Sequence, residues 1–360
     1  MTDFVKDSIA LLREMVRVPS ESFSEAAVAD LVFGRLSEWG LAPELVGKNV
    51  IARNSNFNEE LPTLVLDAHI DTVPPARGYT RDPFDPGEDT GVVYGLGSND
   101  DGGSVAAITA VFRYFYNREL PFNLVLALSA EEEKSGPGGA VMLYGPDGPS
   151  AVRDADWVIV GEPTGMKAAT SERGLLVLDG TARGVSGHSA RSEGVNALYI
   201  ALDDILALRS HKFSKISSRM GSVRLNVTQI ACGTAHNVIP DTCSFVVDIR
   251  PTDCYSNSEI LEELQSVCTS TLVPRNLRNS SSATYDGSPL AKAVESIGLE
   301  TFSSPTTSNW MRTGKDAIKL GPGDSSRSHR ADEYILCSEI EEAVEKYILL
   351  IENFYGNSLE

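Results

Sequence analysis

The chain lacks several features that would assign it to other classes of protein. It has no run of basic residues, and its 31 lysines and arginines are outnumbered by 50 aspartates and glutamates, which leaves a formal net charge of −19. Such a charge repels nucleic acids and anionic membrane surfaces. No apolar stretch reaches the ~18 residues that a membrane span requires. We therefore expect no nucleic-acid partner and no membrane partner.

Cysteine is scarce, and no two cysteines form a CxxC pair. The five residues are odd in number and scattered along the chain: Cys232, Cys243, Cys254, Cys268 and Cys337. This pattern predicts reduced thiols in a cytosolic protein, and neither a disulfide framework nor a thiolate metal site. The first twenty residues have the pattern of a charged amphipathic helix and not that of an export signal, which also favours a cytoplasmic location.

The composition is that of a folded chain, with 42% hydrophobic and 22% charged residues among 360. That length favours two domains of roughly 100–200 residues over a single core. Two solid apolar runs, at 63–70 and 123–130, flank a stretch at 104–116 whose apolar residues recur at helical spacing. Because buried parallel strands joined by a crossover helix have this pattern, we predict an α/β fold with a mostly parallel sheet.

The pattern changes after residue 173. Strand-like alternation at 175–184, 223–233 and 243–251 is interleaved with helical patterns at 195–210 and 258–267, and an edge strand is expected near 272–278. These elements predict an α+β sandwich. Helical patterns then resume at Leu290 and at 338–354. We therefore predict a first domain in two parts, 1–173 and 284–360, with a self-contained domain at 174–283 inserted between them.

Side chains that often bind metal follow the apolar strands of the first domain. His69 and Asp71 stand two residues apart, so they share one side of an extended strand, and Asp71 can bind the far ring nitrogen of His69. Asp100 lies in a glycine-rich loop before the predicted helix, where a carboxylate can bridge two cations about 3.5–4 Å apart. A plain polar pair and a helix N-cap are the alternatives for these residues.

Three consecutive carboxylates, Glu131 to Glu133, directly follow the second apolar run. Such a run is normally a solvated face, but here an apolar strand brings it to the carboxyl end of the sheet, where we expect only cations or protonation to relieve the repulsion. One carboxylate can bind metal while its neighbour acts as general base. Glu162 follows a later apolar run in the same way, and His329 adds an imidazole from near the end of the chain. A set of oxygen and imidazole ligands without thiolate suits zinc, cobalt or manganese.

Taken in order, several segments resemble those of the co-catalytic dinuclear zinc deacylases and aminopeptidases: LDAHID, GLGSNDDGG, SAEEE, VGEPT, GHSA, NVIP and GPGDSSRSH. That family includes N-acetylornithine deacetylase, succinyl-diaminopimelate desuccinylase and carboxypeptidase G. The resemblance covers nearly the whole chain, and the tail GPGDSSRSHRADEYI most resembles the arginine- and lysine-pathway deacylases. Within the family, the chain as a whole most resembles the N-acetylornithine and N-acetylcitrulline deacetylases. It implies a catalytic α/β domain with an inserted lid and dimerisation domain at 174–283.

The resemblance also implies a pair of zinc ions per chain, for which cobalt or manganese can substitute, and these ligands: His69, Asp100, Glu133, Glu162 and His329. His69 and Glu162 would bind one ion. Glu133 and His329 would bind the other, and Asp100 would bridge the two. Glu132 corresponds to the general base and Asp71 to the partner of His69. In the family the peptide bond after the bridging aspartate is cis.

In the inserted domain, His188 resembles the histidine that one subunit of a homodimer sends towards its neighbour's active site, where it stabilises an oxyanion. Asn237 and Arg250 resemble the residues that hold the substrate's carboxylate, a task for which the arginine fork is suited. The alternatives are a capping histidine near a turn for His188 and an ordinary surface arginine for Arg250.

Two segments depart from the family pattern. Asp101 and Gly102 stand where many relatives have Met-Lys, and Asn309 stands where many have the aspartate of a TSD segment. We expect the first departure to leave metal binding intact, because the ligand itself remains. We expect the second to alter the recognition of an amine on the substrate's side chain.

The reaction implied by the resemblance is hydrolysis of the amide bond of an N-acyl amino acid, such as N-acetyl- or N-succinyl-ornithine or citrulline, in arginine biosynthesis. A water molecule activated by the cations would give its proton to Glu132, which would pass it to the departing amine. A succinyl-diaminopimelate desuccinylase or a dipeptidase is the alternative within the family. A non-catalytic relative that binds amino acids or peptides is the alternative of another class, but such a protein has no need of Glu132.

Overall fold

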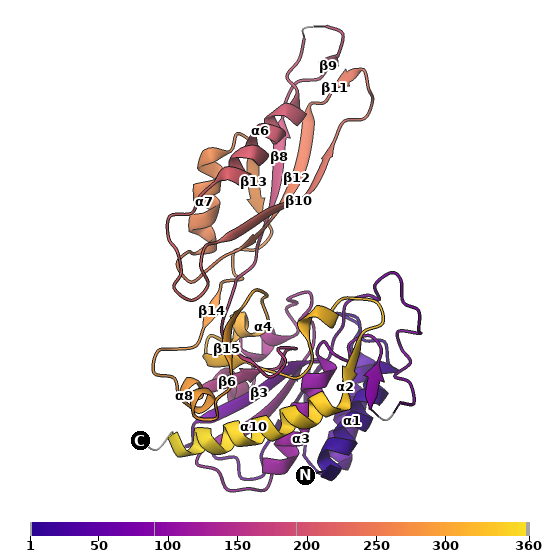
Figure 1. Ribbon diagram of the computed structural model, residues 1–360, viewed down its shortest axis with the longest axis vertical. Coiled ribbons are helices and arrows are strands. Elements are labelled where there is room, and N and C mark those ends of the chain that lie inside the picture. Colours follow the sequence, from indigo (N-terminus) through magenta and orange to yellow (C-terminus); the bar gives the residue numbers. More distant parts are fainter. Residues whose placement is uncertain (1, 90, 192, 358–360) are drawn as a thin grey trace. The chain divides into compact units, whose positions relative to one another are not determined.

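The computed structural model describes residues 2–89, 91–191 and 193–357, and the chain forms two compact units (Figure 1). The first unit comprises Met1–Thr170, Ala283–Phe302 and Ser308–Glu360, and the second comprises Ser171–Ser282 and Ser303–Thr307. The second unit thus includes a short segment, 303–307, that lies outside the inserted domain predicted at 174–283. In the described ranges, no helix combines the length and the apolar character needed to cross a membrane.

A mixed nine-stranded sheet forms the centre of the first unit. Its strands are β1 (Glu44–Val46), β2 (Asn49–Arg53), β3 (Thr63–His69), β5 (Asn123–Ser129), β6 (Trp157–Val160), β7 (Ala168–Glu172), β14 (Ser282–Ala283), β15 (Thr301–Ser304) and β16 (Asp316–Lys319). The order is β1-β2-β5-β3-β6-β16-β7-β14, and β15 pairs with β7. The central strands β5, β3, β6 and β16 run parallel, whereas β1 and β2 are antiparallel. The chain crosses from one unit to the other within β7, at β14 and within β15.

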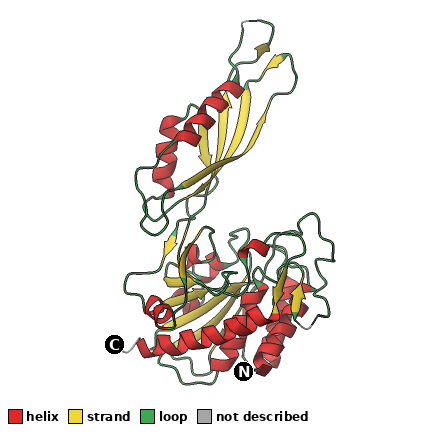
Figure 2. Cartoon of the chain, in the orientation of Figure 1, coloured by secondary structure: helices red, strands yellow, loops and turns green. Residues whose placement is uncertain are grey.

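Helices cover this sheet (Figure 2). They are α1 (Thr2–Val16), α2 (Ala26–Glu38), α3 (Gly102–Phe115), α4 (Ala140–Leu143), α5 (Ser150–Arg153), α8 (Pro289–Ser296), α9 (Trp310–Thr313) and α10 (Cys337–Asn357), with a 3-10 turn, η1 (Ser325–Arg327). A small separate sheet pairs β4 (Val92–Tyr94) with β17 (Tyr334–Leu336). The long helices α1, α3 and α10 pack against one another, and the short helices α4, α5 and α9 belong to a second hydrophobic cluster.

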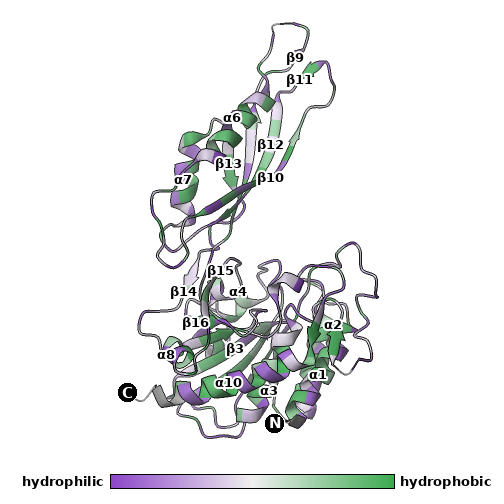
Figure 3. Ribbon diagram, in the orientation of Figure 1, coloured by the Kyte–Doolittle hydropathy of each residue, from purple (hydrophilic) through white to green (hydrophobic). Residues whose placement is uncertain are grey.

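Burial on both faces explains why the central strands are continuously apolar. Every residue of β3 is buried. Leu64 and Leu66 belong to the core formed with the long helices, while Val65 belongs to the other cluster, with Leu143 and Trp310. In Figure 3 these strands are mostly green, whereas α10 shows green and purple patches, as an amphipathic helix does. The prediction of an α/β fold with a mostly parallel sheet is confirmed.

The second unit is an antiparallel sheet with two helices. Its elements are β8 (Leu176–Arg183), β9 (Gly187–His188), α6 (Ala197–Ser210), β10 (Arg224–Cys232), β11 (Val238–Ile239), β12 (Thr242–Arg250), α7 (Asn257–Val267) and β13 (Thr271–Pro274). The sheet order is β10-β12-β8-β13, and β9 pairs separately with β11. Burial alternates along β8, with Leu176 and Leu178 in the core, because only one face of this sheet is covered. The pair β9 and β11 was not predicted.

Candidate metal centre

The parallel strands of the first unit end at one edge of the sheet, and the predicted ligands follow them. His69 is the last residue of β3, Glu133 follows β5, and Glu162 follows β6. His329 lies in the segment after β16, and Asp100 lies just before α3. Because the carboxyl ends of neighbouring parallel strands meet, side chains from distant parts of the chain converge here.

Asp100 stands between two imidazole rings. Its Oδ1 lies 3.3 Å from Nε2 of His69, and its Oδ2 lies 3.7 Å from Nε2 of His329. His329 Nε2 is also 2.9 Å from Oε1 of Glu133. The peptide bond between Asp100 and Asp101 is cis, in agreement with the family pattern. One carboxylate therefore faces the two histidines, which is the arrangement expected of a bridging ligand.

The surroundings of His69 fix the protonation of its ring. Nδ1 lies 3.0 Å from the backbone carbonyl oxygen of Asp71 and 3.4 Å from Oδ1 of the same residue. A carbonyl oxygen only accepts hydrogen bonds, so Nδ1 carries a proton, and in the neutral ring the lone pair is on Nε2, which faces Asp100. Asp71 is thus a partner of His69 through its backbone as well as its side chain.

The same Asp71 carboxylate orders the loop after β5. Its Oδ1 accepts a hydrogen bond from the backbone N–H of Glu132 at 2.9 Å, and its Oδ2 accepts from Glu133 N–H at 3.2 Å and from Ser22 Oγ at 2.7 Å. Burial by itself would raise the pKa of Asp71, but these donors and His69 hold it below its ordinary value. Asp71 therefore fixes the positions of one histidine and two glutamates together.

Glu131 does not share the site of its two neighbours. Its backbone is left-handed, with φ 59°. Its Oε1 lies 3.2 Å from Nζ of Lys48, and its Oε2 accepts from the N–H of Gly138 at 2.8 Å. Lys48 also pairs with the buried Glu25, which accepts from the N–H of Glu131 at 3.1 Å. A lysine ammonium, shared with Glu25, is thus the cation that faces the carboxylate of Glu131.

Glu132, Glu162 and His329 retain protons more strongly than usual. Burial raises the pKa of Glu132 to about 8, and the nearby Glu133 adds to the effect although His69 opposes it. Burial also raises the pKa of Glu162, against the attraction of Lys319. The hydrogen bond to Glu133 raises the pKa of His329 to about 9. Crowded anionic groups of this kind are stabilised by bound cations.

Two ligand groups fit such cations. Donor atoms of His69, Asp100 and Glu133 all lie within 4.8 Å of one another, and so do those of His69, Glu132 and Glu162. These groups differ from the predicted ligand sets, because Glu132 lies among the donors around His69, His69 belongs to both groups and His329 to neither. His329 approaches the group that contains Asp100 through Glu133, whose Oε1 lies 2.9 Å from its Nε2. The oxygen and nitrogen donors suit zinc, cobalt or manganese, so the chemistry of this set fits a pair of divalent cations.

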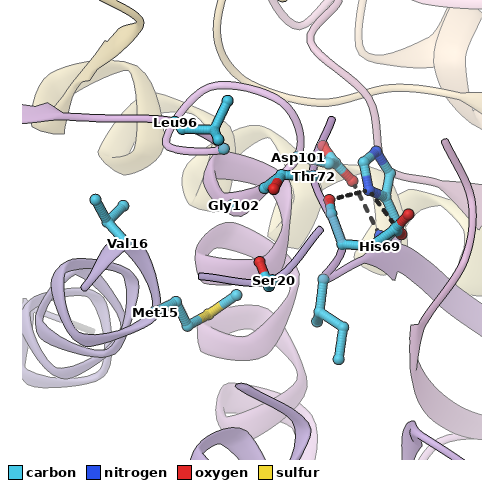
Figure 4. A pocket seen from close by; sticks show the side chains of 11 residues that line it. Met15, Val16, Ser20, His69, Thr72, Leu96, Asp101 and Gly102 are labelled. Carbon is cyan, nitrogen blue, oxygen red and sulfur yellow. Dashed lines mark hydrogen bonds and ion pairs between the residues drawn. The ribbon is translucent and has the colours of Figure 1, made fainter. Parts of the chain in front are cut away.

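The structure explains the Asp101-Gly102 departure from the family pattern. Asp101 is buried, and its Oδ2 accepts from the backbone N–H of His69 at 3.4 Å. Figure 4 shows Asp101 beside His69 and Thr72 at a cavity with room for about one water molecule. At Gly102 a Cβ atom would overlap Gly97 O and a methyl group of Leu12. A larger side chain at 102 therefore does not fit this loop.

Asn309 has its amide turned into the protein. Its Nδ2 donates to Oδ1 of Asp67 at 2.9 Å and to Oγ of Ser129 at 2.7 Å, and the residue is only 5% exposed. Asp67 also accepts from the hydroxyl of Tyr144 at 3.0 Å. Burial raises the pKa of Asp67 to about 6, although these donors oppose the rise. Asn309 thus links the ends of β3 and β5.

The predicted oxyanion-stabilising residue, His188, and the two residues predicted to bind substrate, Asn237 and Arg250, belong to the second unit. His188 lies in β9 opposite Val238, next to Asn237. Its Nδ1 accepts from the N–H of Ala190 at 3.1 Å, which is the capping contact considered as its alternative role. Arg250 is the last residue of β12, and its guanidinium makes two bonds to Asp248, at 2.8 and 3.1 Å. The structure therefore brings His188 and Asn237 together and separates both from Arg250.

Several residues around the site were not found from the sequence. Lys48 and Glu25 hold Glu131, and Ser22 holds Asp71. Isolated residues of this kind carry no periodic signal. Glu333 accepts from the backbone N–H groups of Asn99 and Asp100, each at 2.9 Å. Its position in the tail segment, four residues after His329, is the one signal that could have drawn attention to it.

The fold and the paired ligand groups define a dinuclear metal-binding hydrolase. The chain belongs to peptidase family M20/M25/M40, whose family model matches residues 65–353. An acetylornithine deacetylase from Edwardsiella ictaluri is 28% identical over 358 residues, covering 91% of this chain and 92% of that protein. A succinyl-diaminopimelate desuccinylase from Xylella fastidiosa is 27% identical over 377 residues, covering 97% and 98%.

Solved structures share the fold. A Bacillus subtilis protein described as a dinuclear metal-binding peptidase of the M20 family matches with a TM-score of 0.72 at 15% identity, over 99% of this chain and 100% of that one. The aminopeptidase PepT from Bacillus cereus matches with a TM-score of 0.76 at 18% identity, over 97% of this chain and 98% of that one. The recognition made from the sequence is confirmed at the level of the family.

Proposed function

We propose that this enzyme hydrolyses the amide bond of an N-acyl amino acid, with N-acetyl- or N-succinyl-ornithine or citrulline as substrate, and so serves arginine biosynthesis. The names of its relatives, an acetylornithine deacetylase and a succinyl-diaminopimelate desuccinylase, support a deacylase. Desuccinylation of N-succinyl-diaminopimelate is the second candidate reaction. The five free cysteines favour a reducing, cytoplasmic setting.

The observation that carries the proposal is the position of Asp100. Its two oxygens face Nε2 of His69 and Nε2 of His329, at 3.3 and 3.7 Å. Two bound zinc ions, or cobalt or manganese in their place, would polarise the amide carbonyl and lower the pKa of a water molecule between them. We assign His69 and Glu162 to one ion, Glu133 and His329 to the other, and Asp100 to both.

Glu132 is the proposed general base. Its backbone is fixed by Asp71, and its carboxylate lies among the donors around His69, where bound cations would favour the deprotonated form that can accept a proton. It would take the proton of the attacking water as the new C–O bond forms. It would then give that proton to the amine nitrogen as the C–N bond breaks, which releases a carboxylic acid and a free amino acid.

The second unit is proposed to act as a lid and to form a homodimer. Its helix α6 packs on β10 and exposes a stripe of Tyr199, Leu202 and Leu206, whose side chains are 65%, 42% and 58% exposed. β10 is at one end of its sheet, so one edge of the strand is open. An apolar helix stripe beside an open strand edge suits pairing with a second copy of the chain.

A dimer would also reconcile the positions of the predicted lid residues. His188 lies in β9, and Asn237 lies just before β11, past the end of β12 at which that nine-residue strand begins. Arg250 lies at the opposite end of β12 (Figure 1). His188 and Asn237 are therefore separated from Arg250 by roughly 25–30 Å along the strand. Because residues this far apart in one chain cannot hold the same carboxylate, we propose that Arg250, after exchanging Asp248 for the substrate carboxylate, acts in one site with His188 and Asn237 from a neighbouring subunit. There His188 would stabilise the oxyanion.

A substrate panel tests the proposed reaction. Zinc-loaded protein would be assayed for release of free amine from N-acetyl- and N-succinyl-ornithine, N-acetyl- and N-succinyl-citrulline, N-succinyl-diaminopimelate and an unmodified dipeptide. We expect the highest kcat/KM for an ornithine or citrulline derivative. A preference for N-succinyl-diaminopimelate or for the dipeptide would replace the proposed substrate, and release from none of them would contradict a deacylase acting on these amides.

A further inference from the structure

Two loops that are far apart in the chain are joined by hydrogen bonds next to the metal centre. The first loop, 97–101, carries Asp100, and the second, 324–333, carries His329. Glu333 is 2% exposed, and its Oε1 accepts from the backbone N–H groups of Asn99 and Asp100, at 2.9 Å each. Its own carbonyl accepts from the N–H of Gly95 at 2.9 Å. A buried carboxylate from one loop thus binds the backbone of the other.

Asn99 joins the same loops from the opposite direction. It is fully buried, and its amide bonds both backbone groups of Asp324: Nδ2 donates to the carbonyl at 3.1 Å, and Oδ1 accepts from the N–H at 3.0 Å. Nδ2 also lies 3.4 Å from Oγ of Ser328, the residue before His329. A Cβ atom at Gly323 would overlap Oδ1 of Asn99, so the fit here is close.

We propose that Glu333 and Asn99 are positioning residues that set the separation of Asp100 and His329. The inference rests on the proposed function, because it assigns these two ligands to one cation. Ligand atoms must be held within a few tenths of an ångström of their ideal positions for tight binding. Asp100 and His329 come from two loops and not from one rigid element. Five hydrogen bonds between those loops involve Glu333 or Asn99.

Glu333→Met and Asn99→Ala test the inference, because neither new side chain can make these bonds between the loops. Glu333→Gln, whose amide oxygen can still accept both N–H bonds, and Asp332→Asn are the matched controls. Asp332 is the neighbouring carboxylate, but it accepts from the backbone N–H and the hydroxyl of Thr80 at 2.9 and 2.8 Å, away from the ligands. Chelator-treated proteins would be titrated with zinc in competition with a chromophoric chelator. We expect the binding step of the ion that Asp100 shares with His329 to weaken by about 10- to 100-fold in both test variants, and the other step, to which Asp100 also contributes, to weaken less.

Thermal unfolding of the metal-free proteins and the split between kcat and KM separate positioning from general stability. We expect Glu333→Gln and Asp332→Asn to keep the wild-type zinc affinities and metal-free unfolding temperature, and Glu333→Met to lower kcat at limiting zinc with KM little changed. Wild-type affinity for both ions in the test variants would overturn the inference. Equal weakening of both steps together with a fall in metal-free stability would also overturn it, because the residues would then be merely structural.

Metal uptake and hydrolysis by the wild-type chain separate this inference from the proposed function. A wild-type chain that takes up fewer than two ions would overturn the metal assignment and the positioning inference with it. A wild-type chain that binds two ions but hydrolyses no compound of the substrate panel would contradict the proposed reaction only. The zinc titration of the variants would still decide the role of Glu333 and Asn99.

Discussion

At the scale of single residues, the chemistry depends on which residues contact each of the three consecutive glutamates, Glu131 to Glu133. Lys48 holds the side chain of Glu131, whereas the backbone N–H groups of Glu132 and Glu133 are held by Asp71. The left-handed backbone of Glu131 turns the chain between these two environments. One glutamate is therefore paired with a lysine, and two are left to face the histidines.

Glu132→Gln should retain both metal ions but lower kcat by about 100-fold or more, because the amide cannot take up the proton of water. Glu131→Gln is the matched control, since its carboxylate faces Lys48, and we expect a much smaller loss of turnover. Steady-state kinetics and zinc content would be measured for both. Full activity in Glu132→Gln would remove the general-base assignment, and loss of metal would make Glu132 a ligand instead.

Asn309→Asp should destabilise the metal-free protein by about 1–3 kcal/mol, because it would place a second buried carboxylate against Asp67, in place of the amide that now donates to it. The loss should grow above pH 6, as Asp67 with its pKa of about 6 ionises. The exchanged pair Asp67→Asn with Asn309→Asp should recover part of the stability. Urea unfolding measures each free energy, and an unchanged stability in the single variant would contradict this network.

At the scale of elements, strands and helices could be predicted because burial leaves a pattern. β3 and β5 are buried on both faces and so read as solid apolar runs, and β8 alternates because only one face is covered. The ligands could be expected at the ends of these strands for the same reason. The contacts of Lys48 with Glu131 and of Glu333 with Asp100 could not be predicted, because single polar residues brought together by tertiary packing have no periodicity.

Gathering these ligands at one sheet edge makes the stability of the metal-free protein depend on pH. The pKa of Glu132 is raised to about 8 and that of His329 to about 9, so the folded state holds protons that the unfolded state has released. Stability therefore falls as pH rises from about 6.5 to 9. Zinc competes with these protons, so its stabilising effect should grow over the same range.

Differential scanning calorimetry of metal-free and zinc-loaded protein at pH 6.5, 7.5 and 8.5 measures this dependence. Because the net charge of −19 also destabilises the fold as pH rises, Glu132→Gln is the control, and its metal-free stability should fall less steeply than that of the wild type. A metal-free unfolding temperature that rises over this range would contradict the raised pKa values. The same slope in Glu132→Gln would show that Glu132 does not contribute.

At the scale of the whole molecule, the two units carry different parts of the proposed machinery. The predicted ligands and the base all belong to the first unit, and the predicted substrate residues to the second. Family membership could be predicted from short ordered segments, since together they span most of the chain. The assembly could not, because the sequence shows a helix at 195–210 without showing that Leu206 is exposed on it.

Leu206→Arg tests the proposed dimer. Placing a charge in the exposed apolar stripe of α6 should convert a dimer into a monomer and lower kcat by at least about tenfold, because His188 would no longer reach a neighbouring site. Sedimentation velocity gives the assembly, and Lys212→Arg, a conservative change in an exposed residue after α6, is the control. A wild-type monomer, or a fully active monomeric variant, would contradict the role given to His188.

The central claim is that Asp100 bridges two cations, and X-ray diffraction from zinc-soaked crystals at the zinc absorption edge tests it most directly. The account predicts two anomalous peaks about 3.5–4 Å apart, one on each side of the Asp100 carboxylate. One peak should contact His69 and Glu162, and the other should contact Glu133 and His329. A single peak, or peaks away from Asp100, would contradict the account.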